Sequence, residues 1–552
     1  MQDANGVKSV AKIKKRGADC VVEALQAHNV HCIFSLSGNQ IMPLYDALFD
    51  SSIRVLHTRH EGGAVYMAEA YAQMSGDVGV VLITAAPGFA NGLSAMYTAR
   101  ESETPIVVLS GDSPTHKDGR GAFQEFDQCA AAQSIAKTSF RATDATGLHD
   151  DIAKAISLAK SGRPGPVHVA LPDDILRNKA IAASSSKALA SRSELPKHVE
   201  EAVEAVHASL LVSKTPLLLA GPAFCRTHTK PKLRQLASDL GVPIVVFESP
   251  RGLKAPRLGA FVDVAGEADL IVTLGKPLDF MIGFGDASVL SHSCKIIQID
   301  ADAAMLERDR KAHSERDLLQ YQLEPNAVIS HLLSSDSLSK NAAHHHWRQD
   351  VEAAISYRPD IWKRPPPDEP VNSLAFANAI GEFAALNADA SLIIDGGEIG
   401  QWAQALADSD NAIINGPSGA IGASIPYAIG AHIARPNHPV LSVMGDGTAG
   451  FYLAEFETAV RENIPFVAVI GNDAKWNAEH QIQLRDYGEA RTFGCELTPA
   501  RYDQVVADLG GYGEIVTQAS QILPAINRAF ASGKPACINV MIDGQAAPVI
   551  SR

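Results

Sequence analysis

The sequence lacks the features that mark several large classes of protein. Its 552 residues contain no apolar run of the ~18 residues that a membrane-spanning helix needs, so no membrane segment is expected. The seven cysteines are odd in number and none forms a CxxC pair, which argues against a disulfide framework or a zinc site and favours the reducing cytoplasm. Basic residues number 48 against 62 acidic ones, and no basic patch is visible, so nucleic acid is not an expected partner.

The chain is long enough for about three domains of ~150–200 residues each. Short apolar runs alternate with longer helical patterns, which is typical of α/β domains with parallel sheets. We predict three doubly wound parallel-sheet domains, at residues 1–180, 197–335 and 371–552, joined by polar linkers near 178–197 and 334–370. The predicted strands are His31–Leu36, Ile53–His57, Val78–Thr84, Pro105–Ser110, Pro166–Ala170, Pro216–Ala220, Pro243–Phe247, Leu270–Leu274, Lys295–Ile299, Ser391–Ile394, Pro439–Met444, Pro465–Ile470 and Ala536–Ile542.

The most informative stretch is an apolar run that ends in Gly445-Asp446-Gly447-Thr448 and then opens a helix. The two glycines permit a tight turn whose N–H groups can approach phosphate oxygens. The run also fits GxGxxG, so a dinucleotide site has to be weighed. Asp446 argues against it, because a carboxylate would repel a bare diphosphate at low dielectric. A divalent cation between the two groups turns that repulsion into attraction, and Mg²⁺ is commonly shared between carboxylates and phosphates.

A second oxygen ligand for such a cation is expected at the end of a neighbouring strand. Asp473 follows the apolar run Phe466–Ile470, and a helical pattern over residues 452–463 separates it from Asp446. Parallel strands of a βαβ unit end at the same edge of a sheet, so the two carboxylates should lie side by side. Either aspartate alone would be explained as a helix cap or turn residue. Together they predict a site for a diphosphate with Mg²⁺.

This pattern, GDG followed by Asn472-Asp473, resembles the thiamine diphosphate (ThDP) motif of the acetolactate synthase, benzaldehyde lyase and pyruvate decarboxylase superfamily. The resemblance implies that Asp446 and Asp473 ligate Mg²⁺, with the backbone carbonyl of Lys475 as the third protein ligand. The sequence departs from the common form, because Asp473 stands where Asn is usual. The resemblance also implies cofactor contacts at Glu398, Gly419, Ile421, Gly445, Gly447, Thr448, Trp476, Asn477 and Ala478, with Ile421 supporting a V-shaped cofactor.

The chemistry of ThDP also requires a carboxylic side chain. The C2 proton is removed by the cofactor's own aminopyrimidine, once a carboxylic group stabilises its imino tautomer. Arg59-His60-Glu61-Gly62-Gly63-Ala64 resembles the family's R-H-E-x-x-A signature, so Glu61 is the predicted activating carboxylate. By itself, Glu61 would be explained as a carboxylate near the start of a helix predicted over Val65–Gln73. Residues 84–91 resemble a further family motif and add Pro87 and Asn91 as cofactor contacts.

Other side chains are candidates for the substrate side of the site. Gln40 lies in the loop that faces C2 in the family, and Gln124 matches a glutamine that reaches the substrate. Both are predicted to be catalytic, although plain loop amides would explain them equally well. His116 and His480 are weaker candidates, because a solvated histidine is the simpler explanation for each.

The resemblance covers nearly the whole chain and implies an enzyme that makes or breaks a carbon–carbon bond next to a carbonyl. Its expected substrates are a 2-oxo acid, an aldehyde or an acyloin, and the reactions are decarboxylation with carboligation or lyase cleavage. The expected assembly is a homodimer or homotetramer, in which Glu61 of one chain faces the metal site of the other. FAD is not expected, because residues 247–252 lack a G-K-G pattern. An FAD- and ThDP-dependent oxidase and a 2-hydroxyacyl-CoA or oxalyl-CoA type lyase are the enzymatic alternatives.

Overall fold

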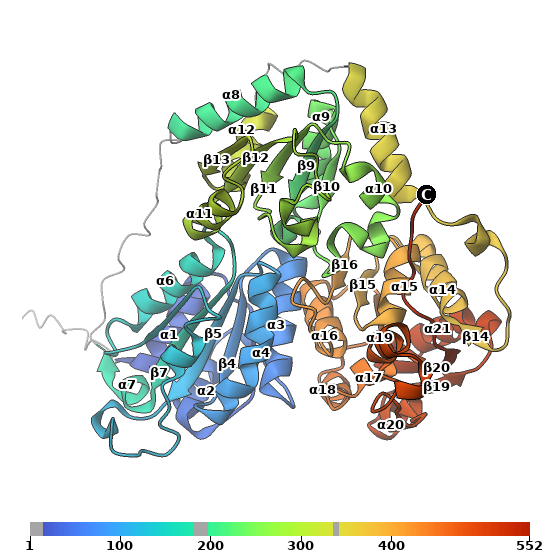
Figure 1. Ribbon diagram of the computed structural model, residues 1–552. Helices are drawn as coiled ribbons and strands as arrows, with labels where there is room; N and C mark the ends of the chain where they lie inside the picture. The colour runs from blue at the N-terminus through green and yellow to red at the C-terminus, as the bar shows by residue number, and fades with distance from the viewer. Residues whose placement is uncertain (1–14, 181–196, 335–341) are drawn as a thin grey trace, which may run out of the picture.

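The computed structural model describes residues 15–180, 197–334 and 342–552, and it contains three large parallel sheets (Figure 1). In Figure 1 the N-terminal sheet is blue to teal, the central sheet is green and the C-terminal sheet is orange to red. Each large sheet falls within one of the three predicted domains. The exact domain boundaries stay a prediction, and most of the predicted linker at 178–197 lies outside the described residues.

The N-terminal sheet has the strand order β3-β2-β4-β5-β7-β6. Alternate residues of its strands face two different cores: Phe34 packs with helix α3, whereas Ile33 packs with helix α1. The sheet is therefore doubly wound, as predicted. Its strands are β2 (Cys32–Ser35), β3 (Arg54–His57), β4 (Gly79–Ile83), β5 (Ile106–Asp112), β6 (Thr138–Arg141) and β7 (Pro166–Pro172); its helices are α1 (Gly17–Ala27), α2 (Met42–Phe49), α3 (Glu61–Ser75), α4 (Pro87–Glu101), α5 (Gln128–Ala132), α6 (Leu148–Lys160) and α7 (Asp173–Arg177). A short antiparallel pair, β1 (Lys15–Arg16) with β8 (Lys179–Ala180), joins the two ends of this region.

The central sheet has the order β10-β9-β11-β12-β13 and is also parallel. Its strands are β9 (Pro216–Ala220), β10 (Ile244–Val246), β11 (Leu270–Leu274), β12 (Lys295–Asp300) and β13 (Leu318–Gln322); its helices are α8 (Lys197–Val212), α9 (Lys230–Leu240), α10 (Phe261–Ala265), α11 (Ala303–Ala312) and α12 (Pro325–Ser334). The second predicted linker contains a helix, α13 (Ala342–Ser356), which packs on this sheet through Trp347. The indole of Trp347 donates to the carbonyl of Pro216 at 2.8 Å, so this segment is part of the fold rather than a free connection.

The C-terminal sheet has the order β14-β20-β18-β17-β15-β16, with β19 also paired to β20. Its strands are β14 (Val371–Asn372), β15 (Ser391–Ile394), β16 (Ala412–Ile414), β17 (Val440–Gly445), β18 (Val467–Asn472), β19 (Tyr512–Val516) and β20 (Ala536–Asp543). Its helices are α14 (Ser373–Leu386), α15 (Glu398–Leu406), α16 (Ser424–Ala434), α17 (Asp446–Ala449), α18 (Glu455–Arg461), α19 (Asn477–Tyr487), α20 (Tyr502–Asp508) and α21 (Ile522–Ala531). Strands β17 and β18 are neighbours, and residue 445 pairs with residue 471. The two predicted aspartates therefore follow adjacent strand ends.

The N-terminal and C-terminal sheets share one hydrophobic core, in which α3 packs against α16 (Figure 1). Gly430 lies at their crossing, and a Cβ atom there would be 2.2 Å from the carbonyl oxygen of Met67. Glycine is therefore required where the two backbones approach this closely. The packing joins the helix that begins at Glu61 to the region that carries Asp446.

All the predicted strands are present, and the strands that sequence patterns missed lie mostly at sheet edges. Strands β6, β13 and β16 are each the last strand of a sheet, and β14 is a two-residue edge strand. β6 and β13 are only partly buried, so their residues lack a continuous apolar run. An edge strand packs on fewer neighbours than a central one, and its sequence signal is correspondingly weaker.

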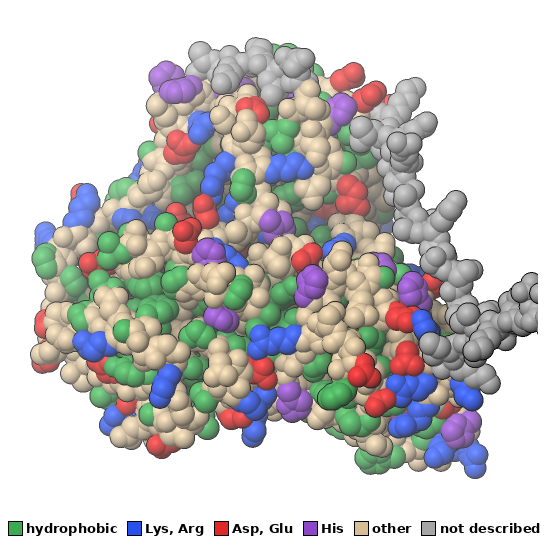
Figure 2. Space-filling model, turned by 180° about the vertical axis from the view of Figure 1, so that it is seen from behind, with side chains coloured by type: hydrophobic (Ala, Val, Ile, Leu, Met, Phe, Trp, Pro, Cys, Tyr) green, Lys and Arg blue, Asp and Glu red, His purple; other side chains and the backbone are tan. Residues whose placement is uncertain are grey.

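Acidic and basic side chains are interspersed on the face of the molecule shown in Figure 2. This mixture fits the moderate negative net charge of −14. Within the described part of the chain, each helix is too short or too polar to cross a bilayer.

Candidate active site

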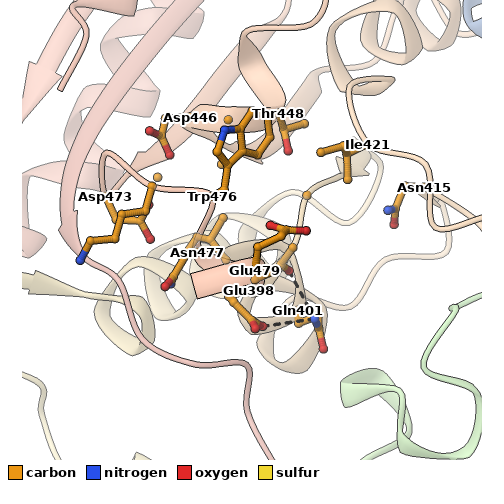
Figure 3. A pocket seen from close by; sticks show the side chains of 18 of the residues that line it. Glu398, Gln401, Asn415, Ile421, Asp446, Thr448, Asp473, Trp476, Asn477 and Glu479 are labelled. Atoms are coloured by element: carbon orange, nitrogen blue, oxygen red, sulfur yellow. Dashed lines mark hydrogen bonds between the residues drawn. The ribbon is translucent and has the colours of Figure 1, made fainter. Parts of the chain in front are cut away.

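A cavity of about 200 Å³ lies at the carboxyl ends of β15, β17 and β18, where parallel sheets usually bind ligands. A loop from the central sheet, Ser249 to Arg251, closes one side of it. The predicted cofactor and metal residues that line the cavity are Glu398, Gly419, Ile421, Gly445, Asp446, Gly447, Thr448, Asp473, Lys475, Trp476, Asn477 and Ala478. Figure 3 shows Asp446 and Asp473 toward one end of the cavity and Ile421 with Asn415 toward the other. The structure thus brings the predicted C-terminal residues together around one space.

The strand and helix predicted on either side of the glycine turn are present. Strand β17 ends at Gly445, and α17 begins at Asp446 with the backbone N–H groups of its first turn unpaired within the helix. A Cβ atom on Gly447 would lie 2.7 Å from the indole ring of Trp476. Gly447 therefore lets Trp476 pack directly on the turn, at the wall of the cavity.

The two aspartates lie close together at one end of the cavity, Asp446 buried and Asp473 partly buried. Asp446 is 1% exposed, and its Oδ2 atom has no hydrogen-bond partner in the structure. Burial, followed by the negative charge of Asp473, raises the pKa of Asp446 well above its ordinary value. Burial also raises the pKa of Asp473, and the nearby Lys475 opposes that rise. A divalent cation would remove the repulsion and supply the missing partner, so these residues fit Mg²⁺.

Asn472 and Asp473 have different surroundings. The Asn472 amide donates to the carbonyl of Ala500 and to Asn539 Oδ1, each at 3.1 Å, and its oxygen accepts the N–H of Ala474 at 3.2 Å. Its side chain is therefore fully used in holding the loop. Asp473 lines the cavity instead. Among the residues that the structure describes, no group of three His, Cys, Asp or Glu side chains could hold a metal, so other oxygens would have to complete the coordination of a cation at the aspartate pair.

The far end of the cavity is held by a buried carboxylate that the sequence patterns did not single out. Asp395 accepts backbone N–H groups from Gly396 at 2.5 Å and from Gly422 and Ser424 at 3.0 Å each. Burial raises the pKa of Asp395 to about 6. The carboxylate ties the end of β15 to the turn that presents Ile421. No local motif shows this role, because two of the three donors lie 27 and 29 residues away.

The middle of the cavity carries polar groups. Glu398 begins helix α15, and burial raises its pKa while the charge of Arg251 opposes the rise. Gln401 donates to Glu398 at 3.4 Å, as the dashed line in Figure 3 shows. The loop residues Ser249, Pro250 and Arg251 were not predicted as site residues. They come from another sheet, and sequence spacing gives no signal for such an approach.

The predicted N-terminal residues form a second cluster. Glu61 is the first residue of α3, four positions earlier than the helix start predicted at Val65, because His60 caps the helix by accepting the N–H of Gly62 at 3.0 Å. Glu61 is buried and accepts the side-chain amide of Asn91 at 2.9 Å. Pro87 begins α4, one turn before Asn91. The predicted contacts Glu61, Pro87 and Asn91 therefore lie together at the start of two helices.

The predicted catalytic glutamines contact one another. Gln40 donates to Gln124 Oε1 at 2.7 Å, and Thr84 donates to Gln40 Oε1 at 2.9 Å. Gln124 has a positive φ of 59°, a conformation that is uncommon for residues other than glycine. This pair is separated by 84 residues in the chain, so their contact is a result of the fold.

Within one chain the two clusters stay apart, because the cavity lining includes none of Glu61, Asn91, Gln40 and Gln124. The two weaker histidine candidates are also outside the lining. His116 is largely exposed and faces Asp174 at 3.4 Å, whereas His480 sits on α19 with a buried, unpartnered Nδ1 atom.

Comparison with known proteins agrees with this geometry. The family described as "Thiamine pyrophosphate enzyme, N-terminal TPP binding domain" matches residues 15–131, and "Thiamine pyrophosphate enzyme, C-terminal TPP binding domain" matches residues 395–540. The chain is 31% identical to the acetolactate synthase large subunit IlvG of Mycobacterium tuberculosis, over 96% of each chain. It is 28% identical to the human 2-hydroxyacyl-CoA lyase 2, over 96% of this chain and 90% of that protein. It is 27% identical to the acetolactate synthase isozyme 2 large subunit of Escherichia coli, over 96% and 95%.

Fold, site and matches together define an enzyme that uses thiamine diphosphate. The chain belongs to the thiamine pyrophosphate enzyme family, with acetolactate synthases and 2-hydroxyacyl-CoA lyases among its relatives. The prediction of a ThDP-dependent enzyme acting on carbon–carbon bonds next to a carbonyl is confirmed at this level.

Proposed function

We propose that the protein is a ThDP- and Mg²⁺-dependent carboligase or lyase of the acetolactate synthase type, acting on 2-oxo acids, aldehydes or acyloins. The observation that carries the proposal is the pair Asp446–Asp473, which lines a cavity of about 200 Å³ and in which the buried Asp446 has an unpartnered carboxylate oxygen. When bound, ThDP would supply a carbon nucleophile and a ring that stabilises the negative charge left by cleavage of a bond next to a carbonyl. The protein has to hold the cofactor, exclude water and hold one proton at the pyrimidine ring.

Each cluster has a separate task in this proposal. Asp446, Asp473 and the backbone carbonyl of Lys475 would hold Mg²⁺, and the N–H groups of the turn at Gly445 to Thr448 would hold the diphosphate. Ile421, fixed by the hydrogen bonds of Asp395, would support the bend of the cofactor.

In the N-terminal cluster, Glu61 would hold a proton at the pyrimidine ring, with its carboxylate oriented by Asn91. Gln40 and Gln124 would orient the carbonyl of the substrate through their amides.

The separation of the two clusters supports a homodimer or homotetramer. Glu61 and Asn91 do not line the cavity of their own chain, whereas the proposed chemistry needs both clusters at one cofactor. A second chain would supply the missing half of each site. The seven cysteines are all free, which supports a reducing, cytoplasmic location.

The test is calorimetry of ThDP binding in the presence of Mg²⁺. Asp446→Ala should weaken binding by at least ~100-fold, because a ligand of the shared cation is lost while the diphosphate keeps its charge. Glu352→Ala, which removes an exposed carboxylate from the ion pair with Arg348, is the control and should bind like the wild type. Unchanged binding by Asp446→Ala would refute the metal role.

Substrate class is decided by product analysis. Release of CO₂ or acyloin from 2-oxo acids supports the acetolactate synthase type of reaction. The 28% sequence identity with human 2-hydroxyacyl-CoA lyase 2 favours a second candidate function, in which a 2-hydroxyacyl-CoA is split into an aldehyde and formyl-CoA. A yellow protein with flavin absorbance would instead support an FAD-dependent oxidase.

A further inference from the structure

Glu455, which has no role in the proposed mechanism, contacts the segment that carries Glu61. Glu455 is the first residue of α18 and is completely buried. Glu455 belongs to the C-terminal half of the chain, whereas the residues it contacts before Glu61 belong to the N-terminal half. Burial raises the pKa of Glu455 to about 7. A buried group of this kind needs strong compensation from its partners.

The partners of Glu455 are the backbone N–H groups just before Glu61. Its Oε1 atom accepts the N–H of Arg59 at 3.1 Å and the N–H of His60 at 3.0 Å. Its Oε2 atom accepts the hydroxyl of Thr458 at 2.7 Å. Residues 59 and 60 immediately precede helix α3, so the carboxylate fixes the backbone at the point where the chain turns into the helix.

The glycines after Glu61 show how closely this segment approaches. A Cβ atom on Gly63 would lie 2.6 Å from Glu455 Oε1, and a Cβ atom on Gly62 would lie 2.3 Å from the hydroxyl oxygen of Tyr452. The Tyr452 ring also packs edge-on against His60, with ring centroids 5.4 Å apart. Residues on both sides of Glu61 therefore pack directly against Tyr452 and Glu455.

We propose that Glu455 is a positioning residue, which sets the direction of the Glu61 carboxylate by fixing the backbone N–H groups of Arg59 and His60. The inference rests on the proposed function, in which Glu61 acts on the pyrimidine ring. Two contacts then orient Glu61: the amide of Asn91 holds its carboxylate, and Glu455 holds the backbone of the two residues that precede it. Glu455 itself does not touch the cofactor in this scheme.

The first test is amide hydrogen exchange in the cofactor-free full-length chain, localised to residues 59 and 60. Glu455→Ala should accelerate exchange at these two amides at least ~10-fold. Glu455→Gln should keep most of the protection, because the amide oxygen can still accept an N–H. Glu462→Ala is the matched control: it lies next to the same helix, in a surface ion pair with Arg54, and should leave these amides unchanged. Unchanged amides in Glu455→Ala would overturn the inference.

The second test is the rate of C2 proton exchange of ThDP in the Mg²⁺ holoenzyme, followed by proton NMR after acid quenching. Glu455→Ala should slow exchange at least ~10-fold, while the dissociation constant of ThDP changes less than ~3-fold. Glu455→Gln should restore most of the rate, which a purely structural defect would not explain. If the alanine variant does not fold, Glu455→Asp, with its carboxylate drawn back by one methylene, is held to the same criteria.

The outcomes separate the two proposals. If C2 proton exchange is normal in Glu455→Ala but lost in Glu61→Gln, the role of Glu455 is overturned and the proposed function stays intact. If C2 proton exchange is normal in Glu61→Gln, the role of Glu61 is overturned, and so is the inference about Glu455. Equal losses of ThDP affinity and C2 exchange in Glu455→Ala would also overturn it, because they show general damage to the site.

Discussion

Replacing Glu69 by glutamine should make the protein more stable at neutral and alkaline pH. Glu69 is fully buried on α3, between the N-terminal and C-terminal sheets. It accepts the hydroxyl of Tyr427 from α16 at 2.8 Å and the side-chain amide of Gln73 at 3.1 Å. Burial raises the pKa of Glu69 from 4.5 to about 7. The protonated form is therefore preferred by the folded protein, and ionisation of Glu69 costs stability.

The size of the effect follows from this shift in pKa. A tenfold change in an acid constant is worth roughly 1.4 kcal/mol, so the rise from 4.5 to about 7 corresponds to about 3 kcal/mol. Because folding raises the pKa of Glu69, protonated Glu69 stabilises the folded protein relative to the unfolded chain. This stabilisation is fully present below the pKa of the unfolded chain, about 4.5, and is lost as the pH rises through about 7. Glutamine keeps one acceptor for Gln73 and offers its amide to the Tyr427 oxygen, but it does not ionise.

The assay is urea unfolding of the wild type and of Glu69→Gln at a series of pH values. The free energy of unfolding of the variant, relative to the wild type, should rise by about 3 kcal/mol between about pH 4.5 and about pH 7.5. Glu352→Gln, which removes an exposed carboxylate paired with Arg348, should give a flat difference over the same range. A flat difference for Glu69→Gln would refute the argument, because it would mean that burial does not hold this carboxyl in its protonated form.

Three further changes test the packing, the cavity and the metal. Gly430→Ala should lower the free energy of unfolding by ~1–3 kcal/mol, because its Cβ would lie 2.2 Å from the Met67 carbonyl oxygen; an unchanged urea midpoint would contradict the close crossing of α3 and α16. Asp395→Ala should cost about 3 kcal/mol, since three buried N–H groups lose their acceptor, and thermal unfolding should show a smaller loss for Asp395→Asn. Removal of divalent cations with EDTA should release ThDP on gel filtration, and Mg²⁺ should restore binding; cofactor retained after chelation would exclude a bridging cation.

Much of the candidate site could be predicted from the sequence because its residues lie in short local patterns. The turn at Gly445 to Thr448 and the signature around Glu61 each combine a strand end, a helix start and a special residue within a few positions. The carboxyl ends of parallel strands meet at one edge, so Asp473 could be placed beside Asp446 without a structure. Apolar runs also predicted the central strands. They did not predict the partly exposed edge strands β6 and β13.

The sequence by itself determined the local features of the candidate site: the glycine turn that carries Asp446, the strand end that carries Asp473 and the helix start that carries Glu61. Only the tertiary structure decided which distant groups support them. Glu69 meets Tyr427 across 358 residues, Glu455 meets Arg59 across 396, and the loop at Arg251 reaches the C-terminal cavity. The physical reason is that backbone turns and strand periodicity depend on adjacent residues, whereas these contacts depend on how whole helices pack, which no local spacing encodes.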